Sequence, residues 1–157
     1  TVSGKTSSST LLRDRLTVIL TTSPVGRHPC TDLLDEVIAS FQLAEGLQEL
    51  DLILVCDGYR SSDERGDAYA QSKFRSGIVD PTSASNYEAY KATLRARAAA
   101  QVSPALRVLE LDSRHGFGFA VKAALDLVQT PYVIVVQHDR PFTRAVNIPR
   151  VLAAMER

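Results

Sequence analysis

The sequence predicts an α/β fold in which a mainly parallel sheet lies between two layers of helices. Four short apolar runs alternate with segments that have the apolar spacing of helices, and this alternation is typical of parallel sheets. The first run is apolar on both faces, as expected for a strand covered on both sides. The 157 residues are about the size of one domain, so one hydrophobic core is expected. We therefore expect a three-layer α/β/α sandwich.

The elements of the first third follow from their composition. Residues 1–12 are expected to be a flexible lead-in, because the first ten are rich in Ser, Thr and Gly, and the domain would span residues 13–157. Residues 16–22 form a β-branched apolar run that predicts the first strand. Thr31 can cap a helix whose apolar stripe recurs every four residues and ends before Gly46.

Three further strands are predicted over residues 50–56, 106–111 and 132–137, because each range is a short apolar run. The second of the four strands stops at the turn pair Asp57-Gly58. A helix over residues 119–128 would connect the third and fourth strands. Asn147 can begin a last helix that runs to the C-terminus.

Residues 59–104 interrupt this rhythm and are interpreted as an insert over the site. Two Ser-x-x-Glu capping boxes occur in it, at Ser61 and Ser85, and the second predicts a helix start. That helix would carry Tyr87, Tyr90 and Leu94 on one face. Residues 72–85 before it are predicted to form a mobile loop.

Charge and composition exclude several classes of protein. Lys plus Arg and Asp plus Glu are both 18, so no excess positive charge would attract nucleic acid or an anionic membrane. No apolar run approaches the roughly 18 residues that span a bilayer. Cys30 and Cys56 lack metal-site spacing and are expected to be reduced, buried thiols, with a disulfide as the alternative. Because the chain begins at Thr1, we expect a fragment of a longer protein, located in the secretory pathway lumen or the cytoplasm.

Two glycine motifs resemble phosphate-binding loops without matching them. Gly4-Lys5-Thr6 lacks the strand that must precede a P-loop. Gly116-Phe117-Gly118 opens a helix after a strand, but the third glycine of a dinucleotide fingerprint is replaced by Val121. The second motif therefore predicts a turn that approaches its neighbours closely.

Polar residues follow three of the predicted strands. The first strand ends in Thr21-Thr22-Ser23, the second in Asp57-Gly58 and the fourth in Gln137-His138-Asp139-Arg140. In open α/β sheets, ligands bind beyond the carboxyl ends of the strands, where these residues would meet. A carboxylate such as Asp57 can accept hydrogen bonds from a base or ribose. Asp139 would repel a diphosphate unless Mg²⁺ or Mn²⁺ bridged them, and Arg114, Lys122 and Arg140 could add positive charge.

Three segments resemble the first half of GT-A glycosyltransferases, especially the family 2 group: LTVILTTSP, LDLILVCDGYR and GFGFAVKAALDLVQTPYVIVVQHDRPF. The likeness covers about residues 14–142, without the 59–104 insert. It implies a GT-A fold, with Thr21, Thr22 and Asp57 at the nucleoside and Asp139 at the metal. The family has Asp-x-Asp where this chain has Gln137-His138-Asp139, so the motif is only DxD-like. His138 is either a metal ligand or a hydrogen-bonded loop residue.

The predicted function is transfer of a sugar from a UDP- or GDP-sugar to a hydroxyl of a glycan, protein or lipid acceptor, assisted by Mn²⁺ or Mg²⁺. The predicted nucleotide-binding residues are Thr21, Thr22, Ser23, Asp57, Arg114, Lys122 and His138, and the predicted metal ligand is Asp139. No catalytic base is identified. The alternatives are a non-catalytic binding module with the same fold and a sugar-phosphate nucleotidyltransferase, whose Gly-rich loop after the first strand is absent.

Overall fold

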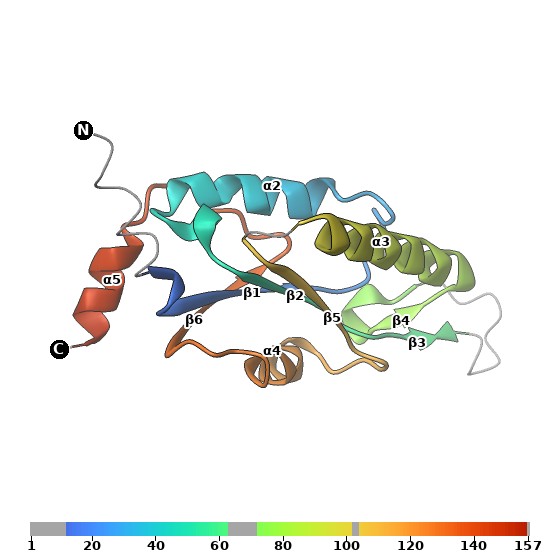
Figure 1. The fold of residues 1–157 in the computed structure, drawn as a ribbon. Helices are drawn as coiled ribbons and strands as arrows, with labels where there is room; N and C mark the ends of the chain where they lie inside the picture. Colours follow the sequence, from blue (N-terminus) through green and yellow to red (C-terminus); the bar gives the residue numbers. More distant parts are fainter. Residues whose placement is uncertain (1–11, 63–71, 102–103, 157) are drawn as a thin grey trace.

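The computed structural model describes residues 12–62, 72–101 and 104–156. Its main sheet has four parallel strands in the order β5-β2-β1-β6. The strands are β1 (Leu16–Thr22), β2 (Leu52–Cys56), β5 (Leu106–Glu110) and β6 (Tyr132–Gln137). Helices α2 (Asp32–Ser40) and α3 (Pro81–Ala100) cover one face, and α4 (Phe117–Leu125) covers the other (Figure 1). The predicted three-layer α/β fold with a parallel sheet is confirmed.

Smaller elements complete the description. A two-stranded parallel ladder joins β3 (Arg60–Ser61) to β4 (Ile78–Val79). The 3-10 turns that lie wholly within the described residues are η1 (Phe41–Leu43), η2 (Leu47–Glu49) and η4 (Phe74–Ser76), and the last helix is α5 (Ile148–Met155). The Asn147 side chain caps α5 by accepting a hydrogen bond from the backbone N–H of Arg150, as the sequence predicted.

The predicted bounds of β1 and β6 are confirmed, while three other elements differ. β2 begins at Leu52 because Leu50 still belongs to a tight turn, in which its N–H bonds the carbonyl of Leu47. β5 ends at Glu110, one residue early. α4 occupies Phe117–Leu125 and not 119–128, because the helix starts directly after Gly116.

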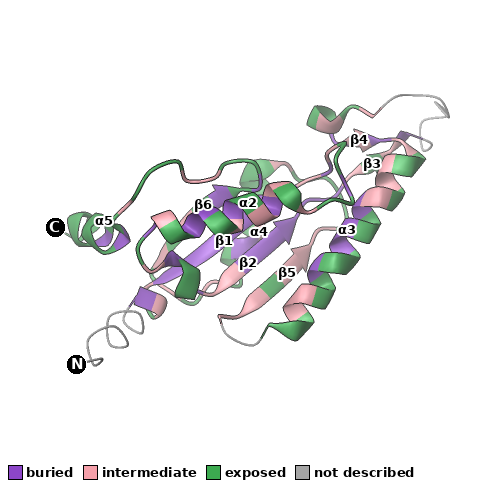
Figure 2. Cartoon of the chain, turned by 90° about the horizontal axis from the view of Figure 1, so that it is seen from above, coloured by how far each residue is buried: buried purple, intermediate pink, exposed green. Residues whose placement is uncertain are grey.

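Two hydrophobic clusters hold the layers together. The larger one packs α2 and α3 on the sheet through side chains such as Leu34, Val37 and Leu94. The smaller one places Ala120 and Ala124 of α4 against the other face, where their small side chains let the helix approach closely. Figure 2 shows the resulting pattern, with the central strands buried and the outer faces of the helices exposed.

The expectation of a mobile loop over residues 72–85 is wrong. That range contains η4 and β4, and α3 begins at Pro81 before the predicted start at Ser85. The physical cause is Asp80, whose carboxylate accepts a hydrogen bond from the N–H of Ser83 at 2.9 Å, while Pro81 suits the first helical position. The capping box at Ser85 lies inside the helix instead. Residues 1–11 of the predicted lead-in, which include Gly4-Lys5-Thr6, and Glu64 of the other box lie outside the described residues. The expected lead-in is one residue too long, because Leu12 is buried in the larger hydrophobic cluster.

The helix inside the predicted insert is a core element. Tyr87, Tyr90 and Leu94 of α3 are each at most 1% exposed and belong to the larger hydrophobic cluster. At its C-terminal end, Arg97 forms an ion pair with Asp35 of α2, whose pKa is lowered mainly by that hydrogen bond. α3 therefore contributes to the stability of the domain itself.

Two smaller expectations are also settled by the structure. Cys30 and Cys56 are both free, as predicted, but Cys30 is exposed and only Cys56 is buried. Thr31 occupies the position before α2 without capping it, because its hydroxyl donates to the Asp35 carboxylate at 2.7 Å. Within the described ranges, no helix is long and apolar enough to cross a membrane.

Replacing Asp80 by alanine is expected to destabilise the protein by about 1 kcal/mol at pH 7, the usual cost of losing a helix cap. Hydrogen bonds from Ser72 and Ser83 lower the pKa of Asp80 to about 2, below the ordinary value of about 3.9. Because the pKa is lower in the folded state, this stabilisation is complete above about pH 4 and is lost as the pH falls towards 2. Urea unfolding at pH 7 and pH 2.5 would measure it. If the free energies of unfolding of Asp80→Ala and the original protein differ by the same amount at pH 7 and pH 2.5, the ionised Asp80 carboxylate is not the stabilising cap.

Candidate functional site

A cavity of about 280 Å³ lies at the carboxyl ends of the parallel strands, between the loops that follow β1, β2 and β6. β1 lies between β2 and β6, so the connections that follow β1 and its neighbours leave the sheet in opposite directions at this edge. Ligands bind at such a switch point in open α/β sheets. The predicted residues that line it are Thr21, Thr22, Ser23, Asp57, Arg114, His138 and Asp139. Lys122 is exposed on α4 and does not line it. We call this space the carboxyl-edge cavity.

The end of β1 fixes the two neighbouring strand ends through backbone hydrogen bonds. The N–H of Asp57 donates to the carbonyl of Thr22 at 2.9 Å, and the N–H of His138 donates to the carbonyl of Thr21 at 3.0 Å. The Thr22 hydroxyl lies 3.3 Å from the hydroxyl of Tyr90 on α3 and is hydrogen-bonded to it. Of the two threonines, Thr21 is therefore the better placed to contact a ligand through its hydroxyl.

Asp57 holds the loop that begins α4. Its carboxylate accepts hydrogen bonds from the backbone N–H groups of His115 at 2.8 Å and Gly116 at 2.9 Å, and only 7% of the residue is exposed. Next to it, Gly58 is required by close packing, because a Cβ there would lie 2.3 Å from the backbone carbonyl carbon of Ser113. Asp57-Gly58 and the glycine motif at 116–118 thus form one structural unit. The sequence suggested both motifs, but not their contact.

Two arginines from different segments line the same cavity. Arg114 was predicted, whereas Arg75 in η4 was missed, because it lies in the segment expected to be a loop. Arg114 Nη2 donates to the carbonyl of Arg75 at 2.7 Å. Its side chain lies across Gly77, where a Cβ would come within 1.7 Å of Arg114 Cδ. In the described ranges, neither guanidinium forms an ion pair with a carboxylate.

Two histidines are buried near the cavity. His138 is 9% exposed, and its Nδ1 has no hydrogen-bond partner among the described residues. His28, which the sequence did not single out, packs on Tyr90 with ring centroids 4.0 Å apart, and its Nε2 contacts the carbonyl of Ser23 at 3.2 Å. Burial lowers the pKa of both histidines, so both rings are neutral at pH 7. His138 thus offers a neutral ring beside the cavity.

The residues near Asp139 do not form a metal site by themselves. Asp139 is exposed, and its closest cation is Arg140, with Nε 3.9 Å from a carboxylate oxygen. Gln137 stands where the resemblance places a first carboxylate. Among the residues that the structure describes, no three His, Cys, Asp or Glu side chains are grouped so that they could hold a metal ion. Asp57 also lines the cavity, but each of its carboxylate oxygens accepts a backbone hydrogen bond, which leaves Asp139 as the carboxylate available to a divalent ion. This donor set does not fit a metal held by the protein alone.

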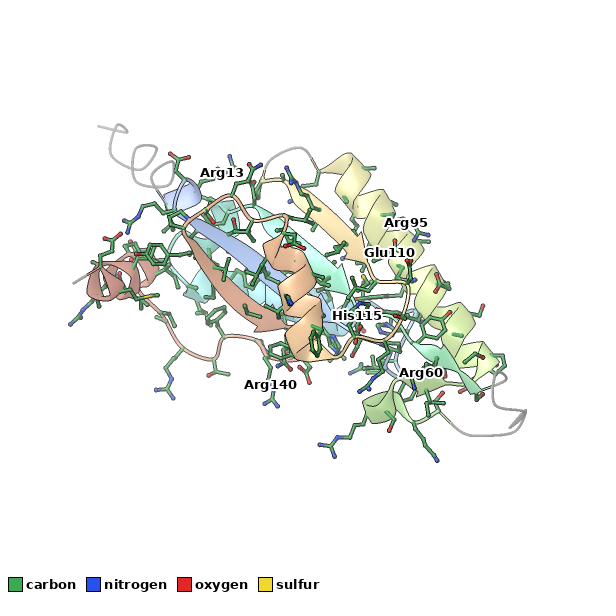
Figure 3. The ribbon with its side chains drawn as sticks, turned by 90° about the horizontal axis from the view of Figure 1, so that it is seen from below. Arg13, Arg60, Arg95, Glu110, His115 and Arg140 are labelled. Carbon is green, nitrogen blue, oxygen red and sulfur yellow. The ribbon has the colours of Figure 1, made fainter. Side chains whose placement is uncertain are left out.

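The site lies at the end of the sheet where α4 begins. Figure 3 shows the labelled His115 and Arg140 at this end, beside the first turn of α4. The cavity therefore combines strand-end acceptors, two arginines, a neutral histidine and the start of a helix. This combination suits a ligand with hydrogen-bonding groups at one end and negative charge at the other.

Comparisons with known proteins leave the family open. No protein-family model matches the chain, and no curated protein matches it. A solved structure of S. aureus TarS is a structural neighbour, with a TM-score of 0.45 and 17% sequence identity. The match covers 89% of this chain and 19% of the TarS chain. A similarity of this size does not show a shared function.

Proposed function

We propose that this chain is the nucleotide-binding part of a glycosyltransferase and that a nucleoside-diphosphate sugar binds in the carboxyl-edge cavity. The observation that carries the proposal is the position and lining of this cavity. It lies at the switch point of a parallel sheet and is lined by Asp57, His138 and two arginines that have no carboxylate partner among the described residues. The sequence resemblance to GT-A glycosyltransferases supports the same assignment independently.

The nucleoside would occupy the side of the cavity formed by the ends of β1 and β2. Thr21 and Ser23 offer hydroxyl groups, and Asp57 retains carboxylate lone pairs beyond the two it uses for backbone N–H groups. Phe117 is 53% exposed and lines the cavity, so its ring is available for stacking with a base. A UDP- or GDP-sugar meets these requirements.

The chemistry proposed is transfer of the sugar to a hydroxyl of a glycan, protein or lipid acceptor. Negative charge develops on the diphosphate as it leaves, and fixed cations beside it would lower the barrier. Arg75 and Arg114 provide such cations at the cavity. Mn²⁺ or Mg²⁺ on Asp139 stays a prediction and would depend on the substrate phosphates for its remaining ligands.

Two observations favour a second candidate, a non-catalytic nucleotide-binding module. Gln137 replaces the first carboxylate of the motif that the resemblance implies, and both Asp57 oxygens already accept backbone hydrogen bonds. Such a module would bind the nucleotide sugar and leave it intact. Incubation with the bound sugar nucleotide and an assay for release of the nucleoside diphosphate separates the two candidates.

Calorimetric titration with UDP, GDP, ADP and their sugar derivatives tests the proposed function. We expect one base to be preferred and its sugar nucleotide to bind with 1:1 stoichiometry, because the cavity holds one ligand. Thr21→Val should weaken binding of that nucleotide about fivefold through loss of one hydrogen bond, about 1 kcal/mol. Thr130→Val, far from the cavity, is the matched control. Absence of binding by every nucleotide in the panel would refute the proposal.

A further inference from the structure

We propose that Arg75, Arg114 and the first-turn amides of α4 hold the diphosphate directly, so that nucleotide binding does not require a divalent metal. This inference rests on the proposed function and identifies how the same cavity would bind the charged part of its ligand. It differs from the metal-assisted site that the sequence predicted around Asp139. Three independent features of the cavity support it.

The first feature is the start of α4. Gly116 occupies the position before the helix and has no side chain to cap it. The N–H groups of Phe117, Gly118 and Phe119 have no partner within the helix, because the first intrahelical bond runs from Ala120 to Gly116. Uncapped helix starts bind phosphate groups through these amides and the helix dipole. Gly116 and Phe117 line the cavity, so the start of α4 faces the proposed ligand.

The second feature is that the preceding loop is held in place before any ligand arrives. Asp57 accepts both of the preceding N–H groups, from His115 and Gly116, and thereby fixes the direction of the first turn of α4. Gly116 has φ 77°, a conformation that favours glycine. The site therefore does not need to order this loop when it binds an anion.

The third feature is the pair of arginines. The aliphatic part of the Arg114 side chain packs against Gly77, and its Nη2 donates a hydrogen bond to the carbonyl of Arg75. The fold therefore fixes the position of this side chain. Arg75 comes to the same cavity from η4. In the part of the chain that the structure describes, both guanidinium groups lack carboxylate partners, which leaves two positive charges for a ligand. A guanidinium binds phosphate through two parallel hydrogen bonds.

A buried histidine supplies a further polar position. His138 is nine-tenths buried, lines the cavity, and has an unpaired Nδ1 in the described structure. A buried ring nitrogen without a partner is unfavourable, so a bound ligand or its water is expected to satisfy it. Arg75 and Arg114 thus supply the positive charge that a diphosphate needs. Asp139, the single carboxylate of the DxD-like motif, is not required to hold a metal for this purpose.

The test compares three probes by calorimetry, each in EDTA and in Mn²⁺: inorganic pyrophosphate, the preferred nucleoside diphosphate and the matching nucleoside. We expect EDTA to change the affinity for the diphosphate less than threefold. Arg75→Gln and Arg114→Gln should each lower the affinity for pyrophosphate and nucleoside diphosphate about tenfold, the usual effect of a charged hydrogen bond. Neither variant should change nucleoside affinity. Arg107→Gln is the matched control: it removes the charge of an exposed arginine that lines a separate cavity, and it should bind like the original protein.

Gly77→Ala provides a second variant that leaves both arginines in the sequence. The new methyl group would occupy the slot of the Arg114 side chain, so we expect the same selective loss of diphosphate affinity, with a folded far-ultraviolet circular dichroism spectrum as the check. The inference is overturned if nucleotide binds only with Mn²⁺, if Asp139→Asn abolishes that binding, and if the arginine variants bind normally. In that case the proposed function stands. If pyrophosphate binds through the arginines but no nucleoside or nucleotide is preferred, the proposed function fails and the anion site remains.

Discussion

Replacing Asp57 by alanine is expected to lower the free energy of unfolding by about 1–3 kcal/mol, because two backbone N–H groups lose a charged acceptor. It should also weaken nucleotide binding at least tenfold. The N–H groups of His115 and Gly116 would no longer be held, so the first turn of α4 would lose its direction in addition to any direct contact between Asp57 and the nucleoside. The two effects have one cause, the bridge from the end of β2 to the start of α4.

Urea unfolding and calorimetry measure these effects on the same preparation. Asp112→Ala is the matched control, because it removes the same charge from an exposed position close to the same loop. The control should change stability by less than about 0.5 kcal/mol. If Asp57→Ala and Asp112→Ala behave alike, Asp57 is an ordinary turn residue and the bridge has no functional importance.

Leu94→Ala in α3 is expected to cost about 2–5 kcal/mol, the usual range for a large aliphatic side chain removed from a core. Leu94 is 1% exposed and packs with Tyr87 and Tyr90 in the larger cluster. Denaturant unfolding of this variant would measure the loss. Thr93→Ala, on the exposed side of the same helix, should change stability by less than about 1 kcal/mol. An equally small loss for Leu94→Ala would show that α3 is a peripheral part of the predicted 59–104 insert.

The sheet was predictable because its strands are short, apolar and bounded by turn residues. The ends of β1, β2 and β6 meet at one edge of the sheet, as expected. The position of Asp57 in the cavity lining could be predicted because this residue directly follows β2 at the carboxyl edge. Its partners His115 and Gly116 could not, since they lie 58 and 59 residues away and are brought there by the packing of α4.

The residues that were missed lie in irregular or misassigned segments. Arg75 reaches the cavity through η4 and the short β3-β4 ladder, which have no periodic signal. Gly77 was a usable clue, because a glycine before Ile78-Val79 suggests a backbone position with positive φ, here 67°. The pair Asp80-Pro81 was a stronger signal for the start of α3 than the capping box at Ser85. His28 is placed by its contacts with two distant tyrosines, which no local pattern reveals.

The most direct test of nucleotide binding in the carboxyl-edge cavity is the backbone amide spectrum of the ¹⁵N-labelled protein during titration with the preferred nucleoside diphosphate in EDTA. The largest shifts are predicted at Gly116, Phe117 and Gly118, with smaller shifts at the end of β1. Residues at the opposite end of the sheet, such as Asp51 and Thr130, line a separate cavity and should not shift. Large shifts at Asp51 and Thr130 with an unchanged α4 start would contradict this account.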